Sequence, residues 1–324
     1  MVEPEKIIVY TCPYVPAEWI AAHGLRPRRL IPLPVEKALT IPRIEGLCPY
    51  ARAFVNDVAA SDNVGGIIVT TMCDQMRRVF DLLVRRVDTP AFLLNVPSTW
   101  QTVTAQRLYV DELKRLGRFL VRLGGHEPDD EELVRIMLES DDARCRVGLA
   151  PPTGFGGASP TLHSSLAHDG NGVHGTPYGV PIAVVGGPLM QRDRALFDVV
   201  EECGGRIVLD ATETGQRGLC GAFDHRRLAE DPLMELAQAY FRIPDASRRP
   251  NSELYNWLKE ELMQTGARGI IFHHYVWCDK WRAEFTRLKE WTDLPVLRLD
   301  SEGDVEMGTA RLRSRVRAFM EMLQ

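Results

Sequence analysis

The chain has 324 residues, a length that suits two domains and that can bury a large core without disulfides. Its apolar and charged fractions of 45% and 26% are ordinary for a globular protein, and its net charge of −5 argues against a nucleic-acid partner. No apolar run reaches the ~18–20 residues of a membrane span, and the N-terminal M-V-E-P-E-K does not resemble a secretory signal. We therefore expect a cytoplasmic protein without a membrane partner.

Short apolar runs alternate along the chain with helical patterns. The expected strands are Ile7–Thr11, Gly66–Thr71, Ala91–Val96, Ile182–Val185, Arg206–Leu209, Gly269–His273 and Val296–Leu299. The clearest expected helices are Val103–Leu123, Glu131–Val147 and Ala310–Leu323. Nearly continuous apolar strands are typical of parallel sheets that are covered on both faces. The alternation predicts an α/β protein with two Rossmann- or flavodoxin-like domains, each a parallel sheet covered by helices.

Residues 150–180 divide the chain, because they are rich in Gly, Pro, Ser and His and show no hydrophobic period. A segment of this kind indicates a long loop, which could cover a cleft. We expect an N-terminal α/β domain over residues 1–125, a connecting helix and loop over 126–180, and a C-terminal α/β domain over 181–324.

One phrase occurs twice, as C-D-Q-M-R-R-V-F-D-L-L-V-R-R-V-D-T-P at 73–90 and as C-D-K-W-R-A-E-F-T-R-L-K-E-W-T-D-L-P at 278–295. Each copy follows an expected strand and begins an amphipathic helix. Cys73 and Cys278 would therefore lie at the carboxyl ends of parallel strands, the edge where open α/β sheets bind ligands. A helix N-terminus favours the thiolate, which is the form that binds metal. The recurring Phe, Leu and Asp-x-Pro suit any strand–helix–strand unit, but the recurring Cys-Asp does not follow from that architecture. We interpret the repeat as two half-units that face a shared cleft.

The other five of the seven cysteines fall into two groups. Cys12, in T-C-P-Y-V-P-A-E, and Cys48, in G-L-C-P-Y-A-R, could reach the same sheet edge. For Cys145, Cys203 and Cys220 an ordinary buried or surface thiol is the simpler interpretation. None of the four candidates forms a C-x-x-C pair, which disfavours a zinc ribbon or a bacterial ferredoxin site. Dispersed cysteines suit a cluster held between domains.

At these residues the chain resembles the iron–sulfur subunits of 2-hydroxyacyl-CoA dehydratases and benzoyl-CoA reductases, a family that includes double-cubane cluster proteins. The matching segments include T-C-P-Y-V-P-A-E-W-I-A-A-H-G-L-R-P, G-L-C-P-Y-A-R-A-F, G-I-I-V-T-T-M-C-D-Q-M-R-R, V-V-G-G-P-L, V-L-D-A-T-E-T-G-Q-R and C-D-K-W. The resemblance implies a 4Fe–4S cluster in the inter-domain cleft, with Cys48, Cys73 and Cys278 as ligands and one iron position open. Cys12 matches a position that is often cysteine in the family but need not be a ligand. The double-cubane branch implies an 8Fe–9S cluster instead.

The resemblance also implies a reaction and partners. The reaction would be low-potential radical reduction or dehydration of an acyl-CoA thioester. A separate ATP-dependent iron–sulfur activator would deliver the electron, and this chain has no G-x-x-x-x-G-K-[ST] loop of its own. The other subunit would be a homologous chain or a second copy. The alternatives are a double-cubane reductase of small molecules, a non-catalytic electron-transfer or scaffold subunit, and a zinc-stabilised α/β binding protein.

Three residues are candidates for catalysis on their position alone. Glu18 begins a helix behind Cys12 and could donate a proton, although a charge near a helix N-terminus needs no catalytic role. His273 and His274 follow the strand before Cys278, and the alternation of side chains along a strand would turn only one of them toward the cleft.

Overall fold

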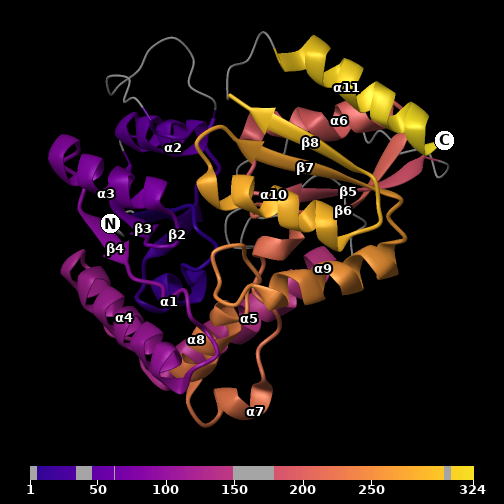
Figure 1. Ribbon diagram of the computed structural model, residues 1–324. Helices are drawn as coiled ribbons and strands as arrows, with labels where there is room; N and C mark the ends of the chain where they lie inside the picture. The colour runs from indigo at the N-terminus through magenta and orange to yellow at the C-terminus, as the bar shows by residue number, and fades with distance from the viewer. Residues whose placement is uncertain (1–5, 34–45, 62, 149–178, 303–307) are drawn as a thin grey trace.

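Two four-stranded sheets organise the chain in a computed structural model that describes residues 6–33, 46–61, 63–148, 179–302 and 308–324 (Figure 1). The first sheet has the order β2-β1-β3-β4 and the second has the order β6-β5-β7-β8. Neighbouring strands are parallel throughout both sheets. Numbered from its own first strand, each sheet has the order 2-1-3-4. The expected α/β fold with two parallel sheets is confirmed, and the two halves share one topology.

The strands agree with the expected ones except at one position. They are β1 (Ile7–Tyr10), β2 (Arg26–Arg29), β3 (Val64–Thr70), β4 (Ala91–Leu94), β5 (Val180–Gly186), β6 (Gly205–Ala211), β7 (Gly269–Tyr275) and β8 (Val296–Ser301). The unexpected strand is β2, with the sequence R-P-R-R. It lies at the edge of its sheet and pairs only with β1, so a proline and long charged side chains are tolerated there.

Helices cover both faces of each sheet. They are α1 (Ala17–Ala22), α2 (Pro49–Ala59), α3 (Asp74–Arg86), α4 (Val103–Arg122), α5 (Asp130–Gly148), α6 (Ala195–Glu202), α7 (His225–Leu228), α8 (Pro232–Phe241), α9 (Ser252–Thr265), α10 (Asp279–Trp291) and α11 (Gly308–Leu323). On the first sheet, α1 and α4 pack with one face and α2 and α3 with the other. On the second sheet, α9 and α10 pack with one face and α6 and α11 with the other.

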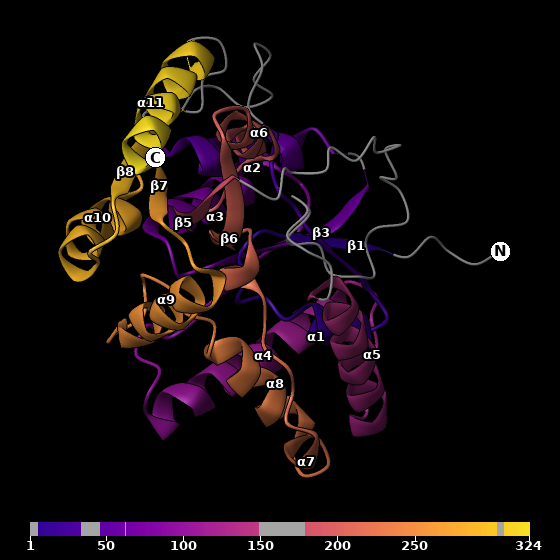
Figure 2. The same cartoon turned by 90° about the vertical axis from the view of Figure 1, so that its right-hand side faces the viewer.

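The segment between the second sheet's β6 and β7 crosses back to the first sheet. Leu236, Tyr240 and Phe241 of α8 are buried in the same core as Ile8 and Leu116 of the first half. In both views α8 lies beside α4, and it also contacts α5 (Figures 1 and 2). The two halves therefore share a hydrophobic core. The domain limits near residues 125 and 180 remain a prediction, and most of the expected 150–180 loop lies outside the described residues.

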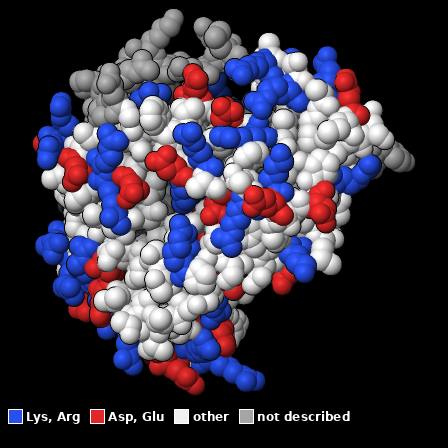
Figure 3. Space-filling model, viewed as in Figure 1, with Lys and Arg blue, Asp and Glu red and all other residues white. Residues whose placement is uncertain are grey.

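Two surface features are also visible. On the face shown in Figure 3, basic and acidic side chains are interspersed rather than segregated by sign. Within the described ranges, no helix combines the length and apolar character that crossing a membrane would require.

The order 2-1-3-4 determines where a ligand can bind. The chain leaves the first strand toward one side of the sheet and the third strand toward the other side, which opens a crevice at the carboxyl ends of these two strands. Cys12 follows β1 and Cys73 follows β3 in the first sheet, while Pro188 follows β5 and Cys278 follows β7 in the second. The topology thus brings the repeated cysteines to equivalent positions in the two halves.

Gly186, at the end of β5, is expected to be essential for this arrangement. Its φ is 153°, and a Cβ atom there would lie 1.9 Å from the carbonyl oxygen of His273. We predict that Gly186→Ala lowers the free energy of unfolding by at least about 2 kcal/mol in chemical denaturation, because backbone must move. At the control position Gly221 a Cβ would meet nothing within 4 Å. Gly221→Ala should change stability by about 0.5 kcal/mol or less, and equal effects of the two substitutions would contradict the prediction.

Candidate functional site

A cavity of about 50 Å³ lies at the carboxyl ends of the strands, and Cys12, Cys48, Cys73 and Cys278 all line it. Its walls come from both halves of the chain, since Pro188, Glu213, Asp245 and Lys280 also contribute. The side chains of Cys203 and Cys220 are elsewhere: Cys203 packs against the core under α6 and α11, and Cys220 is buried with α8. Cys145 falls within α5, but its side chain lies outside the described part of the structure. The structure thus brings together the four cysteines that the sequence singled out.

Three of these cysteines share one local geometry, because each is the N-cap residue of a helix. Cys48 precedes α2, Cys73 precedes α3 and Cys278 precedes α10. The helix of Cys48 begins at Pro49, and the Cys48 sulfur accepts a hydrogen bond from the Ala51 N–H at 3.4 Å. Three helix N-termini, each with a partial positive charge, therefore point at one cavity.

Burial and the local donors act on these thiols in opposite directions. Burial raises the pKa of Cys48, Cys73 and Cys278, the last to about 12. Against this rise, the charge of Lys280 and the backbone N–H groups of the first helical turn lower the pKa of Cys73 and Cys278. Glu213 acts on the same two thiols with the opposite sign and to a smaller extent. Metal binding at this cavity would accordingly release protons.

Cys12 differs from the other three cysteines. Its helix, α1, begins only at Ala17, and the N-cap of that helix is Pro16. Burial, with a contribution from Glu213, raises the pKa of Cys12 to about 12, while hydrogen bonds with Thr70 and with the Tyr14 N–H oppose the rise. Cys12 is therefore at the cavity without a helix N-terminus behind its sulfur.

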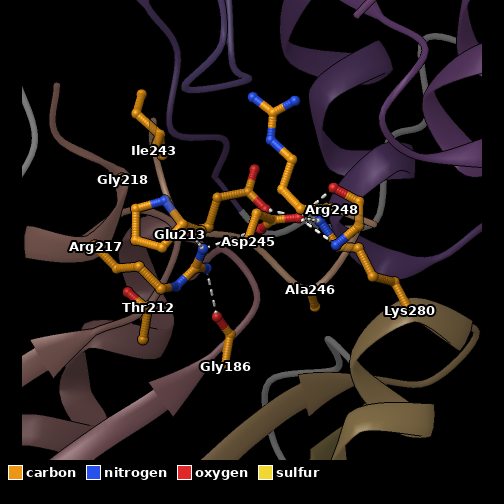
Figure 4. A network of polar contacts seen from close by, with 12 residues as sticks. Gly186, Thr212, Glu213, Arg217, Gly218, Ile243, Asp245, Ala246, Arg248 and Lys280 are labelled. Carbon is orange, nitrogen blue, oxygen red and sulfur yellow. Dashed lines mark hydrogen bonds and ion pairs between the residues drawn. The ribbon is translucent and has the colours of Figure 1, made fainter. Parts of the chain in front are cut away.

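Charged groups on the cavity wall form a network that the sequence did not reveal (Figure 4). Lys280 Nζ lies 3.0 Å from Asp245 Oδ1 and 3.4 Å from Glu213 Oε2. Arg217 Nη1 lies 2.9 Å from Asp245 Oδ2. Burial would raise the pKa of Asp245, but Lys280 and Arg217 together hold it well below its usual range. The four side chains thus form one network of ion pairs, and three of them, Glu213, Asp245 and Lys280, line the cavity.

Gln75 and Lys280 were not among the predicted site residues, although both belong to the repeated phrase. Each occupies the third position of its copy of the phrase, C-D-Q and C-D-K, and each lines the cavity. Gln75 Oε1 accepts a hydrogen bond from the Cys48 N–H at 2.9 Å, and so holds one predicted ligand against the helix of another. The side chains at the third position of the two copies therefore have different partners, Cys48 for Gln75 and Asp245 and Glu213 for Lys280.

Three hydroxyl groups complete the wall. Thr11 Oγ1 and Tyr50 Oη share a hydrogen bond of 2.5 Å, and both residues line the cavity. Tyr275 also lines it, with its hydroxyl accepting from the Met190 N–H at 2.8 Å and donating to Asp193. The tyrosine rings and methionine side chains make most of this surface apolar, which favours exclusion of water.

Glu18 lies in a buried network behind the cavity and not among the residues that line it. Arg144 and Ser140 donate to its Oε1 at 2.6 and 2.7 Å, and Tyr240 donates to its Oε2 at 2.6 Å. Burial raises the pKa of this carboxyl, but Arg144 and the hydrogen bonds outweigh it and the net shift is downward. These contacts connect α1, α5 and α8.

The two histidines also lie outside the residues that line the cavity. Strand β7 continues two residues beyond the expected His273, to Tyr275, and it is Tyr275 that reaches the wall. His274 Nε2 accepts a hydrogen bond from Arg298 Nε at 3.0 Å. His273 Nδ1 is buried without a hydrogen-bond partner among the described residues. Burial lowers the pKa of His273 from 6.5 to about 4.

The structure also shows whether its side chains could bind a single metal ion rather than a cluster. In the parts of the chain that the structure describes, no group of three or more His, Cys, Asp or Glu side chains is arranged to hold one metal ion.

The depressed pKa of His273 predicts a pH-dependent stability. Because its pKa in the folded state is about 4, below the ordinary 6.5, the unfolded chain binds the proton more readily in that window. The stability that neutral His273 contributes is present above pH 6.5 and is lost as the pH falls toward 4. The expected slope is up to about 1.4 kcal/mol per pH unit. In denaturant unfolding, the unfolding free energy of His273→Asn should depend less steeply on pH than that of the wild type. His225→Asn, at an exposed position, is the control and should keep the wild-type pH dependence. Identical slopes in the wild type and both variants would contradict the prediction.

Known proteins provide a further comparison. The family described as "2-hydroxyglutaryl-CoA dehydratase, D-component" matches residues 12–146 and 161–323, a span that includes all four cavity cysteines. A search of curated proteins found no match.

Two solved structures of the SBP FpvC from Pseudomonas aeruginosa are also similar. The complex with Mn²⁺ has 11% identity and a TM-score of 0.27, with 99% of each chain covered. The complex with Ni²⁺ has 11% identity and a TM-score of 0.26, with 99% of this chain and 97% of that chain covered. Scores this low carry no argument about the site. The family match extends over both halves of the chain and both copies of the cysteine phrase, and it shows that this chain belongs to the 2-hydroxyglutaryl-CoA dehydratase D-component family.

Proposed function

We propose that the chain is the iron–sulfur subunit of a 2-hydroxyacyl-CoA dehydratase or benzoyl-CoA reductase type of enzyme. The observation that carries the proposal is the convergence of Cys48, Cys73 and Cys278, each an N-cap residue, on one cavity. Membership of the D-component family supports it independently.

The residues present suit a cubane cluster. Thiolates are the usual ligands of iron–sulfur clusters, and a cubane takes each thiolate at a different corner iron. Its ligands should therefore come from different walls, as the first turns of α2, α3 and α10 do here. The cavity of about 50 Å³ has room for several atoms, since one water needs only about 10–15 Å³ on the same measure. Three thiolates would leave the fourth iron open.

The roles of the protein groups follow from their positions. Bound at this site, a 4Fe–4S cluster would supply one-electron reduction at low potential. The three cysteines would hold it, and the three helix N-termini would stabilise its negative charge. Met72, Met76 and Pro188 would exclude water, and the Thr11–Tyr50 hydroxyl pair would orient a substrate oxygen.

The substrate would be an acyl-CoA thioester, which the enzyme would either reduce or dehydrate. The electron would come from a separate ATP-dependent iron–sulfur activator. The second subunit would be a homologous chain, giving a heterodimer, or a second copy of this one.

Metal analysis under strict anaerobiosis tests the proposal. We expect a brown protein with about four irons and about four sulfides per chain, and an EPR signal after reduction. Cys48→Ser, Cys73→Ser and Cys278→Ser should each lose most of the iron. The matched control is Cys203→Ser, at the C-cap of α6, which should keep it. Iron-free protein that binds zinc stoichiometrically, or equal iron loss in the control, would overturn the proposal.

The second candidate is a double-cubane reductase that acts on small molecules, and the presence of Cys12 at the same cavity favours it. It predicts about eight irons per chain and a large loss of iron in Cys12→Ser. The single-cluster proposal predicts that Cys12→Ser keeps its iron. An iron-replete chain that does not bind substrate, while its partner chain binds substrate alone, would instead identify an electron-transfer or scaffold subunit.

A further inference from the structure

Lys280 is placed where a lysine is unfavourable for two reasons. Its side chain is only 16% exposed, and it lies in the first turn of α10, where the helix already carries partial positive charge. A buried lysine is rare unless it is paired. Here the pairing is double, with Asp245 at 3.0 Å and Glu213 at 3.4 Å (Figure 4). Because burial and the helix N-terminus both disfavour a lysine at this position, Lys280 has a role other than stabilising the helix.

The acidic partner of Lys280 is itself fixed. Asp245 Oδ1 accepts hydrogen bonds from the Ser247 N–H at 2.9 Å and from the Ser247 hydroxyl at 2.5 Å, and its Oδ2 accepts from Arg217 at 2.9 Å. The Arg217 guanidinium also donates to three backbone carbonyls, those of Ala211, Pro244 and Gly186, at 2.8 to 3.0 Å. It lies 4.7 Å from the centre of the Trp281 ring. These contacts are buried or partly buried, and they fix the carboxylate with which the ammonium of Lys280 is paired.

The fixed ammonium shares its cavity with the predicted ligands. Lys280 follows Cys278 by two residues in the same helical turn, and Cys73 lines the same cavity. Glu213, a partner of Lys280, carries the opposite charge and lines the same cavity. The two side chains therefore place charges of opposite sign beside the predicted ligands.

We propose that the fixed positive charge of Lys280 raises the reduction potential of the iron–sulfur group held by Cys48, Cys73 and Cys278, and that Glu213 lowers it. The inference rests on the proposed function. An added electron makes the group more negative, so a neighbouring cation stabilises the reduced form more than the oxidised form. The Lys280–Glu213 pair would then set how readily the site accepts an electron, without either side chain binding iron.

The test is whether substitutions of Lys280 and Glu213 shift the reduction potential in opposite directions. In EPR-monitored redox titrations of the anaerobic protein, Lys280→Met should have a lower midpoint potential than wild type, and Glu213→Gln a higher one. The double variant, which removes one charge of each sign, should return toward wild type. Lys280→Arg keeps the charge and should stay close to wild type. Lys289→Met, at an exposed position of the same helix, is the matched control and should not shift.

The sign of each shift decides the result. Unchanged potentials in iron-replete Lys280→Met and Glu213→Gln, or shifts in the same direction, would overturn the inference, since a purely structural role gives no reason for opposite signs. If Lys280→Met does not fold, the Glu213→Gln shift alone decides. Wild-type protein without iron would instead refute the proposed function, so the two failures can be told apart.

Discussion

The structure depends on one constraint, the convergence of three helix N-termini on a cavity at the carboxyl ends of two parallel sheets. A helix that starts directly after a parallel strand directs its free N–H groups into the space beyond the sheet edge. Two sheets with the same strand order repeat this junction, and each copy of the Cys-Asp phrase occupies one. Cys48 adds a third helix N-terminus, at the start of α2, which does not follow a strand directly. The site therefore favours negative charge before any cofactor is considered.

Contacts between the halves determine which charges surround that space. Helix α8 packs in the core of the first half, and Tyr14 donates a hydrogen bond to the Ile243 carbonyl at 2.7 Å. On the other side of the cavity, Arg29 of β2 donates to the Glu213 carbonyl at 2.7 Å. These contacts hold the Glu213 and Asp245 loops against the cysteines of the first sheet. The electrostatic environment of the site is thus a product of both halves together.

Local patterns predicted the fold well and the site in part. Seven strands and the cysteines at their ends could be predicted, because buried parallel strands are apolar runs and helix starts follow them closely. The edge strand β2 has one partner and charged side chains, so it leaves no apolar signal. His273 and His274 do not line the cavity, because β7 extends beyond its apolar core and Tyr275 takes that position. Lys280, Glu213 and Asp245 meet only in three dimensions, so spacing alone could not pair them.

Cys48, Cys73 and Cys278 are proposed to hold one cluster in the shared cavity. Anomalous diffraction at the iron absorption edge, from crystals grown without oxygen, can locate its iron atoms. We expect a compact group of iron peaks in this cavity, bonded to these three sulfur atoms and not to Cys203 or Cys220. Iron bound at other cysteines, or no iron at the N-termini of α2, α3 and α10, would contradict it.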